Sequence, residues 1–259
     1  MTFPENRFSQ CISYNDPFPC LEFTNFLSKE ETQQLCDIFE KSKFDEFVMG
    51  NRKNIRKGTK NFNNIVNDNK IVSDIYNFFN NENQFEYLIG KLLSISKNSK
   101  NNFKINNRPK TFKDKFYAYK IGVHNLHLIK RFFEFFKRKF PNLNKKFFSC
   151  YFLDMVFAIA GKGYEIKTHV DKPTRIIVLM LFLNDLKEED GGAFEIYSKE
   201  KDNDPTLFKR FKPEAGKLVA FLSNPASFHN VQSISNNEVV RKFIYGSYTA
   251  NVRIEWEKE

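Results

Sequence analysis

The chain is poor in cysteine and in histidine, with four of each among its 259 residues. Its cysteines are Cys11, Cys20, Cys36 and Cys150, and no two of them have C-x-x-C spacing. This arrangement argues against a disulfide scaffold and against a cysteine-rich zinc framework. We therefore expect reduced thiols in a cytoplasmic protein.

Long hydrophobic runs are also lacking. The longest wholly apolar run extends from Ile176 to Leu183, far short of the roughly 20 residues that a membrane-spanning helix needs. The N-terminal segment MTFPENRFSQ has no apolar core of the kind found in a signal peptide. We therefore expect no membrane segment. The chain is long enough to form a single large domain, residues 1–259, with a sizeable core.

Negative charge is scarce in one part of the chain. The net charge is +10, and residues 97–146 contain 15 Lys or Arg but only 2 Asp or Glu. One interpretation of this basic segment is a surface for nucleic acid or another polyanion. The other is a solvated basic face. We favour the second, because no nucleic-acid-binding motif accompanies the charge.

The first part of the chain, residues 1–146, is predicted to be a mainly helical support. Residues 21–26 are apolar enough for a short strand. The sequence Ser28-Lys29-Glu30-Glu31 is a capping box, which predicts a helix as far as about Phe44. Residues 71–96 carry apolar side chains at helical spacing.

Two further segments of this part are polar, and a third is amphipathic. Residues 51–70 and 97–108 are rich in Asn or Lys, and both are predicted to be irregular loops. Residues 126–140 have an apolar stripe opposite a basic face, which predicts a helix that ends at Pro141.

The periodicity changes from Phe147 onward. Short runs rich in Phe, Val, Ile and Tyr alternate with clusters of turn-forming residues, which predicts about eight short strands. Together with the helices ahead of them, these strands indicate an α+β fold with an all-β core over residues 147–253.

This β-rich part contains a set of residues suited to binding a metal. His169 and Asp171 are two residues apart, so on an extended strand both side chains point to the same face. A distant strand can bring His229 to the same point. Two neutral imidazoles and one carboxylate form a donor set suited to a divalent transition-metal ion and leave other coordination positions open. The remaining histidines, His124 and His127, have no third ligand type nearby, and we interpret them as surface or capping residues.

The residues around this set form an ordered pattern. In chain order they are Gly163-Tyr164, Leu183-Asn184, Gly191-Gly192, Pro213, Gly216 and His229-Asn230-Val231. Together with a final strand that carries Arg241, this pattern resembles the Fe(II)- and 2-oxoglutarate-dependent dioxygenases, and the prolyl 4-hydroxylase-type branch in particular. The resemblance covers roughly residues 147–250, and a fainter match lies at residues 17–39.

The resemblance implies a fold, a site and a set of cofactors. The fold is a double-stranded β-helix, the jelly roll that cupins also have. The metal ligands, which form the catalytic centre, are His169, Asp171 and His229. The cofactors are Fe(II), 2-oxoglutarate as cosubstrate and O2, with ascorbate as an additional candidate. Because Asp171 is a carboxylate, hydroxylation is expected and halogenation is not.

Arg241 is the predicted partner of the distal carboxylate of 2-oxoglutarate, since a guanidinium can hold a carboxylate through two hydrogen bonds. Lys242 is the competing candidate. Strand alternation favours Arg241, because it places Arg241, Phe243 and Tyr245 on one face.

The sequence departs from the family at two strand positions, where Phe182 and Ile159 stand in place of tyrosines that relatives often have. A hydroxyl group for the cosubstrate would then come from Tyr151, Tyr164 or Tyr245. Arg175 is a further cation near the site. It could contact a substrate carboxylate or pair with an acidic neighbour, and we favour the second.

The resemblance indicates hydroxylation of an unactivated C–H bond, with a prolyl or other amino-acid side chain of a peptide or protein as the first choice of substrate. A free amino acid or small metabolite is the alternative substrate. A jelly roll that binds metal or 2-oxoglutarate without turnover is the alternative function. Nucleic acid is disfavoured as substrate, because the second arginine expected soon after Arg241 in that branch is missing. Residues 51–70 and 97–110 are candidate lids over the substrate.

Overall fold

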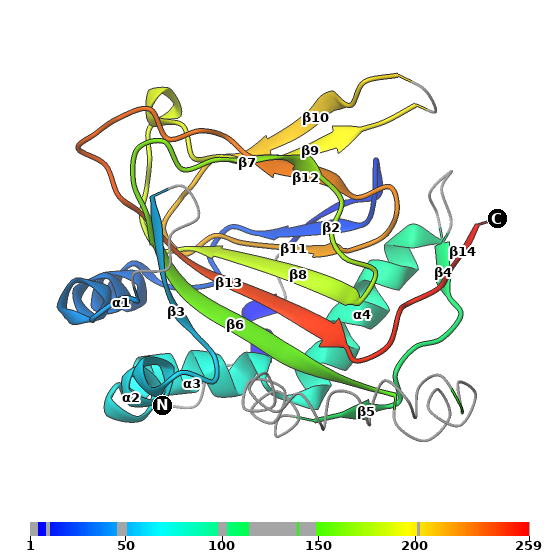
Figure 1. The fold of residues 1–259 in the computed structure, drawn as a ribbon, viewed down its shortest axis with the longest axis horizontal. Helices are drawn as coiled ribbons and strands as arrows, with labels where there is room; N and C mark the ends of the chain where they lie inside the picture. Colours follow the sequence, from blue (N-terminus) through cyan, green and yellow to red (C-terminus); the bar gives the residue numbers. More distant parts are fainter. Residues whose placement is uncertain are drawn as a thin grey trace.

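The computed structural model describes residues 5–8, 11–45, 51–97, 103–113, 139, 149–200 and 203–258. Within these residues, a small β-sheet lies over one face of a large β-sheet, and helices cover the other face (Figure 1). The predicted α+β class with a jelly-roll core is confirmed. The predicted strand count also agrees, because β6 to β13 are eight strands.

The large sheet has the order β1-β2-β11-β8-β13-β6-β3, and β5 pairs with β6. Its strands are β1 (Ile12–Tyr14), β2 (Cys20–Phe23), β3 (Arg52–Arg56), β5 (Thr111–Phe112), β6 (Cys150–Ala160), β8 (Arg175–Phe182), β11 (Leu218–Leu222) and β13 (Arg241–Ala250). The small sheet has the order β10-β9-β12-β7. Its strands are β7 (Ile166–His169), β9 (Phe194–Ser198), β10 (Thr206–Phe211) and β12 (Phe228–Val231).

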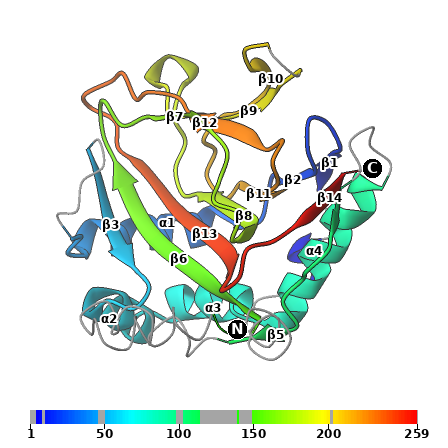
Figure 2. The ribbon, with the colours of Figure 1, turned by 45° about the vertical axis from the view of Figure 1, so that its right-hand side comes forward.

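The remaining elements lie around these two sheets. The helices are α1 (Lys29–Lys41), α2 (Lys60–Asp68), α3 (Lys70–Phe79) and α4 (Glu82–Ser96), with short 3-10 turns η1 (Glu5–Phe8) and η3 (Glu188–Asp190). A separate pair, β4 (Phe103–Ile105) and β14 (Trp256–Lys258), lies beside α4 near the C-terminus (Figure 2). None of the described helices is long and apolar enough to cross a membrane.

The central strands of the large sheet take part in two separate apolar cores. On β8, Ile177, Leu179 and Leu181 belong to an outer core that includes residues of all four helices. The alternating residues of β8 belong to an inner core between the two sheets, and they are Val178, Met180 and Phe182. Side chains alternate between the faces of a strand. A strand covered on both faces therefore reads as one continuous apolar run.

The helical predictions for the first part of the chain are largely confirmed. The capping box is formed: the Glu31 backbone N–H donates to the Ser28 hydroxyl, and the Ser28 N–H donates to the Glu31 carboxylate. Helix α1 ends at Lys41. The predicted helix over 71–96 is two helices, because Asn81 begins α4 by accepting a hydrogen bond from the Asn83 N–H.

The prediction of irregular loops is wrong. Residues 51–70 form β3 and α2, and part of 97–108 forms β4. Strand β3, with the sequence RKNIR, buries only Ile55, and it exists because its backbone pairs with β6. The sequence of helix α2 does contain a helix pattern, but the many Asn residues around it favoured the prediction of a loop. Thr59 caps its N-terminus, and Phe62, Ile65 and Val66 form its buried face. Apart from Lys139, the helix predicted at 126–140 lies outside the described residues, and so does most of the basic segment.

Candidate active site

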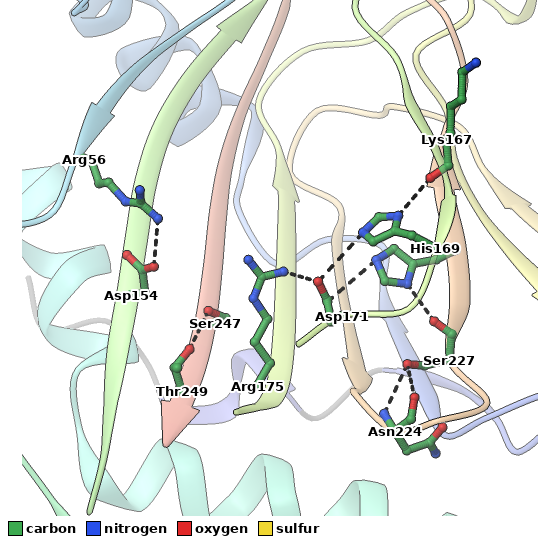
Figure 3. Close-up of polar contacts among 11 residues, drawn as sticks. Arg56, Asp154, Lys167, His169, Asp171, Arg175, Asn224, Ser227, Ser247 and Thr249 are labelled. Atoms are coloured by element: carbon green, nitrogen blue, oxygen red, sulfur yellow. Dashed lines mark hydrogen bonds and ion pairs between the residues drawn. The ribbon is translucent and has the colours of Figure 1, made fainter. Parts of the chain in front are cut away.

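The three predicted metal ligands lie together at one end of the space between the sheets. His169 ends β7, and β12 pairs with β7 so that His229 stands directly opposite His169. Asp171 follows β7 by two residues. Its Oδ1 atom is 3.8 Å from His169 Nε2, and its Oδ2 atom is 3.7 Å from His229 Nε2 (Figure 3). One ligand atom from each residue lies within 4.8 Å of the others.

Backbone carbonyl groups set the orientation of both imidazole rings. His169 Nδ1 is 2.9 Å from the Lys167 carbonyl oxygen, and His229 Nδ1 is 2.8 Å from the Ser227 carbonyl oxygen (Figure 3). A carbonyl can only accept, so Nδ1 of each ring carries a proton, and Nε2 keeps its lone pair when the ring is neutral. Burial lowers the pKa of His229 to about 4, against the opposing effect of Asp171. This ring is therefore neutral at neutral pH.

The donor set fits a divalent metal ion. The Asp171 side chain is only 4% exposed, and its buried Oδ2 atom has no hydrogen-bond partner. Two neutral Nε2 atoms and this carboxylate converge, which is the 2-His-1-carboxylate arrangement typical of non-haem Fe(II). Neighbouring Arg175 contacts Asp171 Oδ1, and its guanidinium carbon lies 5.4 Å from the centre of the Tyr245 ring. The prediction that Arg175 pairs with an acidic neighbour is confirmed.

Arg241 begins β13 and is completely buried. Its guanidinium carbon lies 4.5 Å from the centre of the Phe243 ring and 5.1 Å from that of Phe182. One nitrogen is 3.5 Å from Met180 Sδ, and the Nε and Nη1 atoms have no hydrogen-bond partner. Burial lowers the pKa of Arg241 to about 10. The side chain therefore stays charged at neutral pH, and nothing among the described residues neutralises it.

The neighbouring Lys242 points to the opposite face of β13. Its Nζ atom is 2.6 Å from a carboxylate oxygen of Glu40 on α1. Arg241 therefore faces the inner core, and Lys242 faces the helices. This geometry favours Arg241 for the cosubstrate carboxylate, and that role stays a prediction.

The three tyrosines proposed for the cosubstrate lie in different places. Tyr164 is completely buried, and its ring lies 6.2 Å from that of Phe243. Tyr245 belongs to the inner face, and burial raises the pKa of its hydroxyl group. Tyr151 was a wrong candidate, because it faces the outer core, where its ring stacks 3.9 Å from that of Phe85. Ile159 also packs against the outer core.

The Gly191-Gly192 pair leaves room for Arg241. Both glycines have positive φ, at 79° and 75°. A Cβ atom on Gly191 would lie 2.0 Å from the Ser233 carbonyl oxygen, and one on Gly192 would press on Leu186, Ile234 and the Arg241 side chain at 3.0–3.4 Å. A larger residue at either position would disturb the loop beside Arg241.

Sequence reasoning missed Arg52, which it placed in an irregular loop. Arg52 begins β3, and its Nη1 atom donates to the Tyr164 hydroxyl over 3.3 Å. Its guanidinium carbon lies 5.1 Å from the centre of the Phe243 ring. No pattern in a polar segment such as RKNIR could have indicated this position.

A pocket of about 570 Å³ lies beside the metal-ligand cluster and includes Asp171 in its wall. Three segments line it: residues 170–173, residues 223–225 and residues 253–256. The last segment leads into β14, which pairs with β4 through Trp256 and Ile105. The pocket lies within the size range of ligand-binding sites.

Comparisons with known proteins agree with this geometry. Residues 155–249 match the family model of the 2OG-Fe(II) oxygenase superfamily. No curated protein matches the chain. A structure of prolyl 4-hydroxylases from Phytophthora capsici is similar in fold, with a TM-score of 0.51 and 12% identity over 90% of this chain and 59% of the other.

Two further solved structures are similar at lower scores. A prolyl-4-hydroxylase from Pseudomonas putida has a TM-score of 0.43 and 15% identity, over 89% of this chain and 91% of the other. HygX from Streptomyces hygroscopicus, with nickel and 2-oxoglutarate bound, has a TM-score of 0.46 and 8% identity, over 89% and 82%. The matched segment contains the three converging metal ligands and Arg241. Over residues 155–249 the chain is therefore similar to the 2OG-Fe(II) oxygenase superfamily, and this segment carries the candidate metal site.

Proposed function

We propose that this protein hydroxylates an unactivated C–H bond of a prolyl or other amino-acid side chain within a peptide or protein. His169, Asp171 and His229 would hold Fe(II). When bound, the iron supplies the activation of O2: one oxygen atom enters the C–H bond and the other enters succinate, as 2-oxoglutarate loses CO2.

The chain's own residues would prepare this centre. The carbonyl groups of Lys167 and Ser227 hold the two imidazole rings with Nε2 turned towards Asp171. Arg175 holds the Asp171 carboxylate from the other side. Preset ligands of this kind lose little conformational freedom when a metal binds.

Arg241 would bind the distal carboxylate of 2-oxoglutarate. Its charge is buried, lacks an acidic partner among the described residues and lies among the rings of Phe182, Phe243 and Tyr164. A buried unpaired charge is costly unless an opposite charge joins it. A carboxylate would provide that charge and accept from the unpartnered Nε and Nη1 atoms.

The pocket beside Asp171 carries the choice of a peptide or protein substrate. At about 570 Å³ it has room for more than one side chain. Trp256 lines the pocket with an aromatic side chain, a type that would pack against a prolyl ring, and Lys172, Arg253 and Glu255 line it with charged groups. The candidate lid at residues 97–110 gains support because β4 backs this wall. The candidate lid at 51–70 loses its basis, because that segment is a strand and a helix.

The first test is an anaerobic titration of the protein with Fe(II) and then 2-oxoglutarate, monitored by the visible metal-to-ligand charge-transfer band. The band should appear in the wild type and be absent in His169→Ala. It should also appear in the control Lys167→Ala, because Lys167 orients His169 through its backbone carbonyl and its side chain is exposed. Absence of the band in iron-loaded wild type would contradict the cosubstrate assignment and favour a metal-binding module.

Substrate choice is tested next by O2-dependent succinate release with a library of proline-containing peptides. Stimulation by peptides, lost in Trp256→Ala while the charge-transfer band persists, is the expected result. Stimulation only by free amino acids or small metabolites would overturn the peptide assignment and leave the dioxygenase chemistry intact.

A further inference from the structure

Two arginines from distant parts of the sequence share one row of the large sheet. Arg52 on β3 and Arg241 on β13 both pair with Ala160, the last residue of β6, which lies between them. Ala160 belongs to the inner core. Directly paired residues point to the same face of a sheet. Both arginines therefore point between the two sheets, and the residue between them, Ala160, has a small side chain.

The two guanidinium groups meet at the same aromatic ring. The Phe243 ring centre lies 5.1 Å from the guanidinium carbon of Arg52 and 4.5 Å from that of Arg241. The Arg52 guanidinium also lies 5.9 Å from the centre of the Tyr164 ring and donates to the Tyr164 hydroxyl. Its Nε atom donates to Asn54 Oδ1 over 2.6 Å, which holds the side chain along the strand.

Neither of these arginines has a carboxylate partner among the described residues, although two other arginines near the small sheet do. Arg175 contacts Asp171, and Arg210 contacts Glu195. Burial lowers the pKa of Arg241, and the positive charge of Arg52 lowers it in the same direction. The row therefore holds two like charges with no opposite charge, an arrangement that an anion would stabilise.

Strand β3 is anchored so that Arg52 stays in this position. The Gly161 N–H donates to the Asn51 carbonyl over 3.1 Å, in the turn that leads to Tyr164. Phe182, which lies 5.1 Å from the Arg241 guanidinium, offers no hydroxyl group. Hydrogen bonds to an anion must therefore come from the arginines, with Tyr164 as their neighbour.

We propose that Arg52 is a specificity-determining residue of the cosubstrate pocket, which binds the distal carboxylate of 2-oxoglutarate jointly with Arg241. This inference rests on the proposed function. Arg52 would select a 2-oxo acid that has a second carboxylate over one that ends in a methyl group. It also gives β3 a role in the site, although that strand lies more than a hundred residues before the metal ligands.

Calorimetric titration of the zinc-substituted protein tests this without turnover. The ligands are 2-oxoglutarate and 2-oxopentanoate, which has the same chain length but a methyl group in place of the distal carboxylate. Arg52→Leu should weaken 2-oxoglutarate binding roughly tenfold or more, the usual value of a hydrogen bond to a charged group. Binding of 2-oxopentanoate should change little. Lys53→Leu is the matched control, because it removes the same charge from an exposed neighbour on the same strand.

Each outcome decides the matter. Equal weakening of both ligands, or Arg52→Leu affinities equal to those of wild type, would show that Arg52 only supports the fold and would overturn the inference. If Arg52→Leu does not fold, Arg52→Gln, which keeps hydrogen-bonding groups without the charge, is judged by the same ratio of affinities. A wild type that binds no 2-oxoglutarate would overturn the proposed function and this inference together. If the wild type binds 2-oxoglutarate and the variant has the same ratio of affinities for the two ligands as the wild type, only this inference is overturned.

Discussion

The two faces of the large sheet use the same strands for different purposes. On the outer face, Phe157 of β6 stacks on Phe62 of α2 with ring centres 5.1 Å apart, and Tyr248 of β13 meets Phe85 of α4 at 5.0 Å. On the inner face, the alternating residues of β13 include the buried, unpartnered Arg241, next to Ala160 of β6. Both faces are packed with apolar rings, and the inner face also holds buried charge.

This difference shows how the fold tolerates a costly site. Burial of apolar surface stabilises a fold by about 25 cal/mol per Å², and the outer core extends over four helices and the sheet. The inner face holds Arg241 and Asp171, which have buried polar atoms without a hydrogen-bond partner among the described residues. Both cores therefore stabilise the fold, and the inner one also accommodates the candidate site.

The largest expected effect comes from removing the carboxylate of the inner face. Asp171→Asn should abolish iron retention and turnover, with metal affinity falling by more than the 10–100-fold typical of changes in outer-shell partners. Iron content after desalting and succinate release measure this. Asp204→Asn, at an exposed turn, should behave as wild type. Full iron retention by Asp171→Asn would contradict the assignment of this ligand.

The outer face should respond in the opposite way. Phe157→Ala should lower the free energy of unfolding by about 3–5 kcal/mol, because it leaves a cavity among Phe62 and Phe39. Urea unfolding measures the loss. At a temperature where the variant is folded, 2-oxoglutarate affinity should match the wild type, and a large change there would contradict the separation of the two faces.

A smaller effect is expected where a residue acts through a metal ligand. Arg175→Met should weaken metal binding roughly 10- to 100-fold, since it removes the group that holds Asp171. Competition with a chelator measures the affinity. Arg210→Met is the control, because it breaks an ion pair with Glu195 away from the ligands. Equal effects of both substitutions would argue for a general electrostatic influence.

The smallest expected effect concerns the pH dependence of stability and involves Glu195 of the small sheet. Burial would raise the pKa of Glu195, but hydrogen bonds from Tyr197 and Arg210 outweigh it, and the pKa lies below its usual value. A lowered folded-state pKa stabilises the fold above the unfolded value, about 4.3, and this contribution is lost as pH falls below it. Glu195→Gln should therefore lose less stability than wild type between about pH 5 and pH 3.

This difference should be on the order of 1 kcal/mol at most, because the ion pair is partly exposed on its Arg210 side. Acid-dependent urea midpoints of the wild type and the variant measure it, with Glu238→Gln, exposed, as control. A variant as acid-sensitive as the wild type would place the source of the pH dependence elsewhere.

Sequence patterns were sufficient where a signal is local or belongs to an ordered family pattern. The resemblance to a known family predicted that His169, Asp171 and His229 would lie together, and the structure brings their ligand atoms within 4.8 Å of one another. The capping box at Ser28 predicted the start of α1. Strand alternation favoured Arg241 over Lys242 for the inner face, and the contacts of both residues agree.

Predictions failed where a partner elsewhere in the chain decides the conformation. Strand β3 has no apolar alternation, and its backbone is ordered by pairing with β6 about a hundred residues later. Strand β4 likewise depends on β14 at the end of the chain. Tyr151 has a hydroxyl group that could have donated to the cosubstrate. Its position on β6 instead directs its side chain to the outer core.

The sequence by itself determined the β-rich core through strand periodicity, which is a local property of the chain, and its resemblance to a known family indicated that His169, Asp171 and His229 would lie together. Only the tertiary structure decided which tyrosines face the site, where the pocket beside Asp171 lies and that Arg52 lies beside Arg241. These features depend on strand register between distant segments, and a one-residue shift in register would turn each side chain to the opposite face.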